Sequence, residues 1–263
     1  MSAHRRRAGY APRWLAIPAV LAVAFLVVPL VALVARVSWA TFVADVTSPA
    51  ALGALALSLR TGIAATGVCI VLGVPLALVI ARSGPRTAAF LRAVVTVPLV
   101  LPPMVGGVAL LYLFGRTGWL GASGLPFTTA AVVVAQSFVA LPFLVLAVEG
   151  AVRAAGVDHE RSAAALGAGR GTILRRITLP LAAPGIVAGV VLCFARAIGE
   201  FGATALFAGN APGTTRTMPL AIYTAFNGAG VTQGTAVALS LLLLVTAVAV
   251  LLLVRGWRPG AAA

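Results

Sequence analysis

The chain has 263 residues, of which 61% are hydrophobic and only 9% are charged. Soluble globular domains carry roughly 25% charged residues, and one water-soluble core could not hide this much apolar surface. The composition therefore excludes a soluble protein and indicates an integral membrane protein. The net charge of +14 would also fit a nucleic-acid-binding protein. We exclude that class because the arginines lie between long apolar segments and not on one soluble face.

Long uncharged runs divide the chain into six predicted membrane spans. Each run can supply the ~20 apolar residues that cross a hydrocarbon core of about 30 Å. The runs are continuous, whereas the strands of a membrane barrel alternate over ~10 residues, so we expect an all-α fold. Pro102 and Pro103 are expected to kink the third span. The spans form a single transmembrane domain over 1–263, and they cover residues 14–35, 55–81, 93–115, 127–148, 177–200 and 235–254.

The distribution of arginines predicts the orientation, because cytoplasmic loops are enriched in Arg and Lys. With the N-terminus inside, fourteen of the nineteen arginines lie in cytoplasmic segments and five in outer segments. We therefore expect both termini to lie in the cytoplasm. The uncharged run 14–35 is longer than the roughly 7–15-residue core of a signal peptide, so we interpret it as the first span.

The sequence offers little for enzymatic chemistry, and we predict neither catalytic residues nor a metal site. Without lysine it lacks the Gly-Lys-Ser/Thr triplet of a Walker A loop, so any ATP-driven role needs a separate subunit. His4 and His159 lie outside the apolar runs, and no Ser–His, Cys–His or paired-carboxylate spacing suits catalysis within the membrane. Cys69 and Cys193 lie in apolar spans, where we expect buried structural thiols.

The inner loop between the fourth and fifth spans, residues 149–176, carries a third of the charged residues of the chain. Asp158 can cap a short helix over residues 159–166, and Gly167 can supply the left-handed residue that ends it. Thr172 can cap a second helical turn. This pattern predicts a compact helix–turn–helix on the cytoplasmic face, although a solvated charged loop remains an alternative at this point.

The end of this loop carries a recognisable signature. Gly167 is followed, after nine residues, by Ile177, Leu179 and Pro180. This spacing resembles the Gly-x9-Ile-x-Leu-Pro half of the EAA signature of ABC importer permeases. The resemblance implies that residues 149–176 contain the coupling helix, which docks into a groove on the ATP-binding subunit.

The other half of the signature is imperfect. Its Glu-Ala-Ala positions fall on Arg161, Ser162 and Ala163, and Glu160 lies one position early. This offset leaves the role of Glu160 open. The resemblance implies that six residues of the loop take part in coupling to the ATPase, namely Glu160, Ala163, Gly167, Ile177, Leu179 and Pro180.

Four other segments narrow the resemblance to a subgroup. Residues 194–204, with the sequence FARAIGEFGAT, resemble molybdate permeases and their sulfate and tungstate relatives. Residues 209–219, 101–105 and 114–121 also resemble the molybdate branch, and the similarity covers about 50–254. It implies the type I ABC importer permease fold. The implied function is ATP-driven import of molybdate, or a related oxyanion, across the bacterial cytoplasmic membrane by alternating access.

The resemblance also implies the partners. Two permease copies would form the path through the lipid membrane, two ABC subunits would bind ATP and magnesium, and an extracytoplasmic oxyanion-binding protein would deliver the substrate. This chain would hold no cofactor and bind no nucleic acid.

A sulfate or tungstate permease is an alternative function. An ion-coupled secondary transporter would need acids within the membrane, for which Glu200 is the only candidate, and internal repeats. A membrane scaffold without transport would not need the loop signature.

Two groups near the outer side are candidates for a gate or a translocation path. Arg196 and Glu200 lie one helical turn apart near the end of the fifth span, on one face. They could form an ion pair that stabilises the helix end, or Arg196 could attract an anion while Glu200 orients it. Thr214, Thr215 and Arg216 could donate hydrogen bonds to an oxyanion, or could belong to a plain surface loop.

Overall fold

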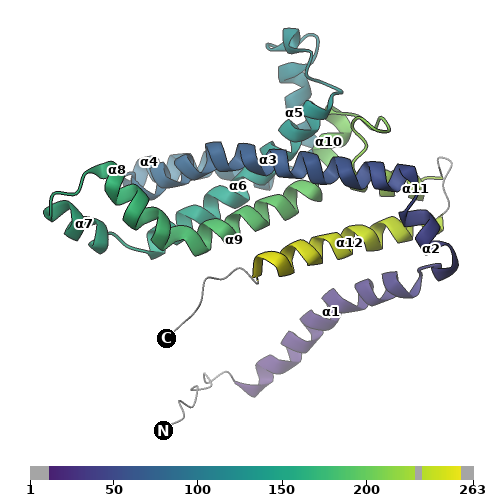
Figure 1. The fold of residues 1–263 in the computed structure, drawn as a ribbon, viewed down its shortest axis with the longest axis horizontal. Helices are drawn as coiled ribbons and strands as arrows, with labels where there is room; N and C mark the ends of the chain where they lie inside the picture. Colours follow the sequence, from purple (N-terminus) through teal and green to yellow (C-terminus); the bar gives the residue numbers. More distant parts are fainter. Residues whose placement is uncertain (1–11, 229–232, 256–263) are drawn as a thin grey trace.

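The computed structural model describes residues 12–228 and 233–255, and these residues form helices joined by short connections (Figure 1). The all-α prediction is therefore confirmed. His4 and four of the arginines used to predict orientation lie outside the described residues. The main helices are α1 (Ala16–Ala35), α2 (Trp39–Val46), α3 (Pro49–Arg82), α4 (Pro85–Val100), α5 (Pro103–Phe114), α6 (Thr129–Ala154), α7 (Asp158–Ala165), α8 (Arg170–Ile173), α9 (Leu179–Ile198), α10 (Gly202–Phe207), α11 (Met218–Phe226) and α12 (Gln233–Arg255).

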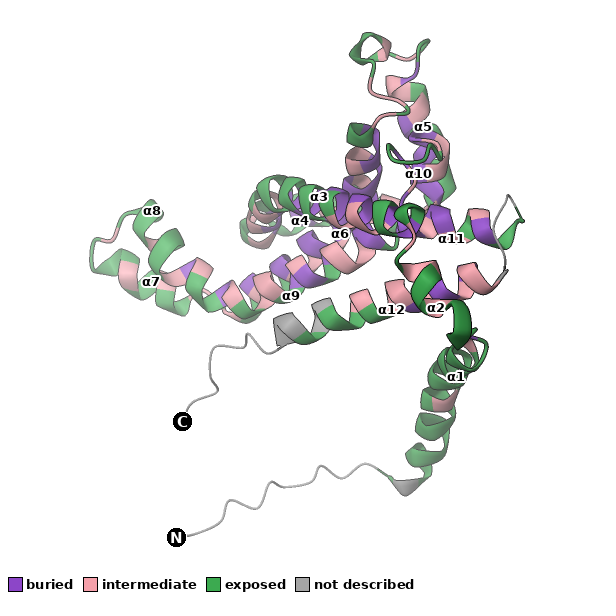
Figure 2. Cartoon of the chain, turned by 45° about the vertical axis from the view of Figure 1, so that its right-hand side comes forward, coloured by how far each residue is buried: buried purple, intermediate pink, exposed green. Residues whose placement is uncertain are grey.

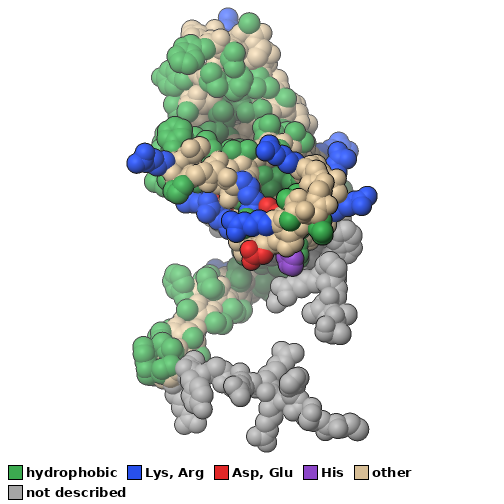
Figure 3. Space-filling model, turned by 90° about the vertical axis from the view of Figure 1, so that its left-hand side faces the viewer, with side chains coloured by type: hydrophobic (Ala, Val, Ile, Leu, Met, Phe, Trp, Pro, Cys, Tyr) green, Lys and Arg blue, Asp and Glu red, His purple; other side chains and the backbone are tan. Residues whose placement is uncertain are grey.

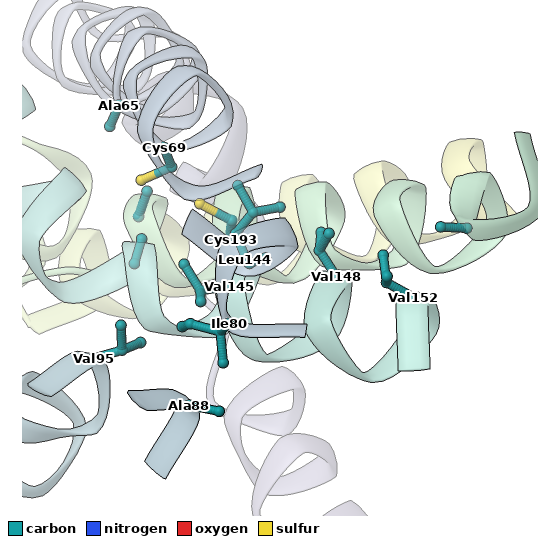
Figure 4. Close-up of a cluster of buried hydrophobic side chains, with 14 residues drawn as sticks. Ala65, Cys69, Ile80, Ala88, Val95, Leu144, Val145, Val148, Val152 and Cys193 are labelled. Carbon is teal, nitrogen blue, oxygen red and sulfur yellow. The ribbon is translucent and has the colours of Figure 1, made fainter. Parts of the chain in front are cut away.

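The centre of the molecule is a bundle of α3, α6 and α9, with α4 packed on its side (Figure 1). Its core consists of small and branched apolar side chains, among them Ile80, Leu144 and Val148, which are completely buried (Figure 4). A Cβ atom added at Gly185 on α9 would lie only 2.1 Å from the Cβ of Ala151 on α6. Glycine at this position therefore lets the two helices approach closely, as small residues do between membrane helices.

The predicted third span, 93–115, is not one continuous helix. It is divided between α4 and α5, whose axes are bent by 107° at the break. Leu101 and Pro102 are extended, with ψ angles of 136° and 133°, because a residue that precedes proline disfavours the helical region. Pro102 and Pro103 thus interrupt the helix where the sequence predicted a kink, and the interruption is much sharper than a kink.

α5 is held in this direction by α10 and α6, on which it packs. A Cβ atom at Gly107 would lie 2.8 Å from the backbone oxygen of Ala203 on α10, so the backbones of the two helices are in contact. Leu110 of α5, Val139 of α6 and Phe207 of α10 belong to the same buried cluster. In Figure 1, α5 and α10 stand upright from the bundle.

Four helices of the described chain are long and apolar enough to cross a membrane: α1, α3, α6 and the continuous helix Arg170–Ile198. The bent pair α4–α5 makes a fifth span if it is counted as one. α12 contributes a shorter apolar stretch over 234–249. The count of six spans and the orientation with both termini inside therefore stay predictions.

Two helices extend into the predicted inner loop, 149–176. α6 continues to Ala154, past the predicted end of the fourth span at 148, so Glu149 is a helical and buried residue. The fifth helix begins at Arg170, before the predicted start of the span at 177, and ends at Ile198, so Glu200 lies beyond it. Charged residues end an uncharged run in the sequence, but arginine and glutamate are good helix formers, so a helix continues through them. The bounds of the membrane spans stay predictions.

α1 lies apart from the rest of the molecule, and no described side chain on it is buried (Figure 2). Its sequence is apolar throughout, with Pro29 inside the helix. Such a helix has no polar face to present to water, so it needs lipid or another protein surface around it.

Candidate functional site: the inner loop and the outer ion pair

Glu160 holds the inner loop to two helices of the bundle. Its Oε1 atom accepts a 2.7 Å hydrogen bond from the hydroxyl of Thr178, immediately before α9. The same atom forms an ion pair with Arg82, the last residue of α3, and the Arg82 guanidinium also donates to the Gly156 carbonyl at 3.4 Å. Glu160, which departs from the EAA spacing by one position, therefore fastens α7 to the ends of α3 and α9.

α7 ends as the sequence predicts. Gly167 has a φ angle of +84°, in the left-handed region that disfavours side chains with a Cβ atom. The Ala168 N–H donates to the Ala163 carbonyl and the Gly167 N–H donates to the Ala164 carbonyl, both at 3.0 Å, which is the Schellman pattern of a helix C-terminus. Leu166 directly before this turn is 89% exposed, so the tip of the loop presents an apolar side chain.

The two predicted helix caps in the loop are wrong. Asp158 is the first residue of α7 and Val157 is its cap position, with no side-chain hydrogen bond. Thr172 lies inside α8, whose cap position is Gly169. In both cases the helix begins upstream of the predicted cap. The Arg161 N–H donates to the Val157 carbonyl, and the Thr172 N–H donates to the Gly169 carbonyl.

The second part of the signature lies at a π-helical turn, Leu174–Thr178, which joins α8 to α9. Pro180 is in the first turn of α9 and has no N–H group, so the ordinary helical hydrogen bond to residue 176 is missing. The preceding N–H, of Leu179, reaches the Leu174 carbonyl, five residues back. Ile177 lies in this turn, and the wider turn accommodates the proline without breaking the helix.

A buried carboxylate near the loop was missed by the sequence analysis. Glu149 on α6 is 3% exposed, and its Oε1 atom lies 2.5 Å from Nη2 of Arg92 on α4 and 2.8 Å from Nε of Arg153. Arg153 also donates to the Ile80 carbonyl of α3 at 3.3 Å. Glu149 therefore joins α4, α6 and α3. The i,i+4 spacing of Glu149 and Arg153 was the one signal for part of this network.

Arg196 and Glu200 form an ion pair at the end of α9, which is one of the two alternatives that the sequence left open. Nη2 of Arg196 lies 2.7 Å from Oε2 of Glu200, whose side chain is 1% exposed. The Oε1 atom of Glu200 accepts a 2.8 Å hydrogen bond from the backbone N–H of Ala203 in α10. Glu200 thus links the last turn of α9 to the first turn of α10, and this geometry supports the interpretation as an ion pair that stabilises the helix end.

The polar groups of the outer loop are used to hold the loop itself. The buried hydroxyl of Thr215 accepts from the Ala211 N–H at 2.9 Å. The Thr214 carbonyl accepts from the Thr129 hydroxyl at 2.8 Å. The Arg216 guanidinium donates to the side chain and the carbonyl of Asn210, at 2.9 and 3.2 Å. The described residues show no hydrogen bond or ion pair between this loop and Arg196, so the structure gives two separate outer groups.

Cys69 and Cys193 are both buried and both reduced, as expected for structural thiols (Figure 4). The Cys69 thiol lies 3.5 Å from the Ser137 carbonyl, within the core between α3 and α6. Within the part of the chain that the structure describes, no group of three or more His, Cys, Asp or Glu side chains could hold a metal ion.

Known proteins resemble this chain in sequence. Residues 73–259 match the family described as the binding-protein-dependent transport system inner membrane component. The chain is 52% identical to the molybdenum transport system permease protein ModB of Mycobacterium tuberculosis, over 94% of its own length and 95% of the relative. It is 40% identical to the protein of that name from Escherichia coli K12, over 70% of its own length and 83% of the relative.

Solved ABC importers have the same fold. The structure superimposes on a chain of the inward-facing MetNI methionine ABC transporter with a TM-score of 0.64, at 18% identity, covering 80% of this chain and 99% of the other. It superimposes on a chain of a bacterial alginate ABC transporter with a TM-score of 0.66, at 18% identity, covering 91% of each. The fold is therefore that of type I ABC importer permeases. The chain belongs to the family of binding-protein-dependent transport system inner membrane components, and it is a multi-pass protein of the inner membrane.

Proposed function

We propose that this chain is the permease subunit of an ATP-driven importer of molybdate. The attachment of the inner loop to the bundle is the structural observation that carries this proposal. Glu160 joins α7 to Arg82 at the end of α3 and to Thr178 before α9. A displacement of α7 is therefore transmitted to two long membrane helices and is not absorbed by a flexible linker.

The energy source in this proposal is a partner subunit. Two ABC subunits bind ATP and magnesium and hold the loop between α6 and α9, with Glu160, Ala163, Gly167, Ile177, Leu179 and Pro180 forming or positioning the coupling segment. Closure of the ATPase pair moves α7, and the bundle changes from inward-facing to outward-facing. Hydrolysis and product release reset it. The permease chain has no lysine for a Walker A phosphate loop, so the proposal assigns ATP hydrolysis to the partner subunit.

The transport path in this proposal is formed by two copies of the chain. The unburied, wholly apolar α1 is covered in this arrangement by lipid or by the second copy. An extracytoplasmic binding protein docks on the outer side and releases the oxyanion into the path. Arg196 and Glu200, with Thr214, Thr215 and Arg216, lie at the outer end in this orientation and are the candidates for the gate.

The substrate assignment rests on the molybdenum permeases that are 40–52% identical to the chain. Tungstate and sulfate are also tetrahedral dianions and are the alternatives. The test is uptake of labelled molybdate into proteoliposomes that contain the chain with its ATPase, with the binding protein added outside. We expect uptake to require ATP, to be blocked by tungstate and to resist equimolar sulfate.

Each outcome of this assay separates one part of the proposal. Equal inhibition by sulfate would keep the ATP-driven importer and move the substrate to the sulfate branch. Uptake that continues without ATP and follows an ion gradient would overturn the proposed mechanism.

A further inference from the structure

The inner-loop end of the bundle contains a pocket to which the coupling proposal assigns no ligand. Its volume is about 550 Å³, and it lies between the end of α3, α7 and α8. Three arginines and five apolar side chains line it, together with Glu160 and Thr178. The arginines are Arg82, Arg161 and Arg170, and the apolar side chains are Leu78, Val157, Ala164, Ile173 and Leu174.

The pocket has positive charge without a matching carboxylate. Glu160 is the only acidic side chain that lines it, and Glu160 already accepts from Arg82 and Thr178. Arg161 on α7 and Arg170 on α8 are exposed, and neither has a hydrogen bond or an ion pair through its side chain among the described residues. Two guanidinium groups on two different helices therefore face solvent with free donors.

The surroundings reinforce this charge. Residues 82–92 and 149–176 contain eight arginines and three carboxylates, and Figure 3 shows arginines spread around this end of the molecule with few acidic side chains among them. One of the three carboxylates, Glu149, is buried in its own ion pairs with Arg92 and Arg153. The field at the pocket favours anions over cations.

The position of the pocket and the chemistry of its arginines indicate which class of anion fits it. Arg82 is the last residue of α3, a helix of 34 residues that is long enough to cross a membrane and to extend beyond it. The pocket is therefore a basic pocket at the end of a membrane helix, and basic pockets between membrane helices on the cytoplasmic side bind anionic lipid headgroups. Arginine suits a phosphate group because its planar donors engage two oxygens at once.

We propose that this pocket binds a phosphate group through Arg161 and Arg170. The group is supplied by the headgroup of an anionic phospholipid, whose chain lies over Ile173 and Leu174, or by free phosphate. A phosphate held by both arginines bridges α7 and α8 and stiffens the loop. Leu166 at the tip does not line the pocket, so an ATPase that docks on the tip leaves the pocket available.

The test measures the melting temperature of the full chain in a neutral detergent. The additions are short-chain phosphatidylglycerol, short-chain phosphatidylcholine, and sodium phosphate, each matched in ionic strength with sodium chloride. At a concentration about ten times its dissociation constant, a bound ligand raises the Tm of a chain of this size by about 3 °C. We expect this rise with phosphatidylglycerol and none with phosphatidylcholine.

The variants are Arg161→Gln with Arg170→Gln, and Arg86→Gln as the matched control, because Arg86 is exposed at the same end of the molecule but does not line the pocket. The double variant should lose the rise in Tm, and the control should keep it. If the ligand-free Tm of the double variant is lowered, the pair Arg161→Lys and Arg170→Lys keeps the charge and should keep the rise.

The remaining outcomes decide between the two sources or overturn the proposal. A rise with phosphatidylglycerol alone identifies a lipid site, and an equal rise with phosphate identifies a site for the free anion. If neither phosphatidylglycerol nor phosphate raises the Tm, the proposal is overturned. The arginines would then be available to an acidic side chain of a docking protein. A rise that the double glutamine variant retains also overturns it, because the effect would then come from general surface charge.

Discussion

Thr178 and Glu160 are separated by eighteen residues and joined by a 2.7 Å hydrogen bond that connects the first turn of a membrane helix to the loop outside it. The same carboxylate pairs with Arg82 at the end of α3. These contacts attach the inner loop to the bundle. They also give a structural role to Glu160, which lies one position before the glutamate position of the family signature.

Replacing Glu160 with Gln should uncouple ATP hydrolysis from uptake. The variant loses the ion pair with Arg82, which is partly exposed and worth about 1 kcal/mol, so the chain should still fold. We expect a several-fold loss of ATP-driven uptake in proteoliposomes with little change in protein level. Asp158→Asn removes an exposed charge from the same loop, where the side chain of Asp158 has no ion pair or hydrogen bond among the described residues, and is the control. Equal uptake by the two variants would contradict the role of Glu160.

Gly167 is required because of its backbone conformation, and not because a larger side chain would lack space. Nothing lies within 4 Å of a Cβ atom added there, but its φ of +84° costs an alanine about 1–2 kcal/mol. Gly167→Ala should therefore shift the tip of the loop and weaken copurification of the ATPase. Gly169→Ala is the matched control, since that glycine has a φ of −68° and equally open surroundings. A loss of copurification in Gly169→Ala as well would show that the backbone angle is not the cause.

Leu166 should contribute directly to binding the ATPase, because a side chain that is 89% exposed gains apolar contact only when a partner covers it. Leu166→Ser should lower the amount of ATPase that copurifies with the chain and leave the Tm of the isolated chain unchanged. Trp119→Ser changes another strongly exposed side chain, 95% exposed and outside the inner loop, and should retain the ATPase. Full ATPase recovery with Leu166→Ser would remove Leu166 from the docking surface.

The approach of α6 and α9 at Gly185 predicts a compensating pair of substitutions. Gly185→Ala places a methyl group 2.1 Å from the Cβ of Ala151, and overpacking of this kind costs about 1–3 kcal/mol. The Tm in detergent should fall, and adding Ala151→Gly should restore most of it. Gly150→Ala, on α6 next to Ala151 and with nothing within 4 Å of the added Cβ atom, should have little effect. A double variant no more stable than Gly185→Ala would show that the contact is not the cause.

Arg196 and Glu200 allow a structural role to be separated from a role in the gate. Arg196→Ala leaves a carboxylate that is 1% exposed without its partner, at a cost of about 3–5 kcal/mol, so the membrane level should fall. The double variant Arg196→Ala with Glu200→Gln removes both charges and should recover the membrane level. If Arg196 acts on the oxyanion, uptake stays low in the double variant. Recovery of uptake together with membrane level would show that the pair is structural only.

The hydropathy of the chain by itself determined that it is an all-α membrane protein, because a backbone in lipid must satisfy its own hydrogen bonds and a helix does so locally. The left-handed turn at Gly167 was also readable, since a glycine after a short helical run is a local signal. The ion pair of Arg196 and Glu200 follows from their spacing of one turn. Each of these features depends on residues that are close in the sequence.

Only the tertiary structure decided the features that join distant residues. Two prolines predict an interruption in the third span, but the 107° bend depends on the packing of Gly107 against Ala203, almost a hundred positions later. The burial of Glu149 depends on Arg92, which lies on a different helix. Glu160 departs from its signature, and its role became visible only when the fold brought Arg82 and Thr178 beside it. Buried charges and close helix contacts are fixed by the arrangement of the helices, because the free energy of burying them depends on partners that no local pattern identifies.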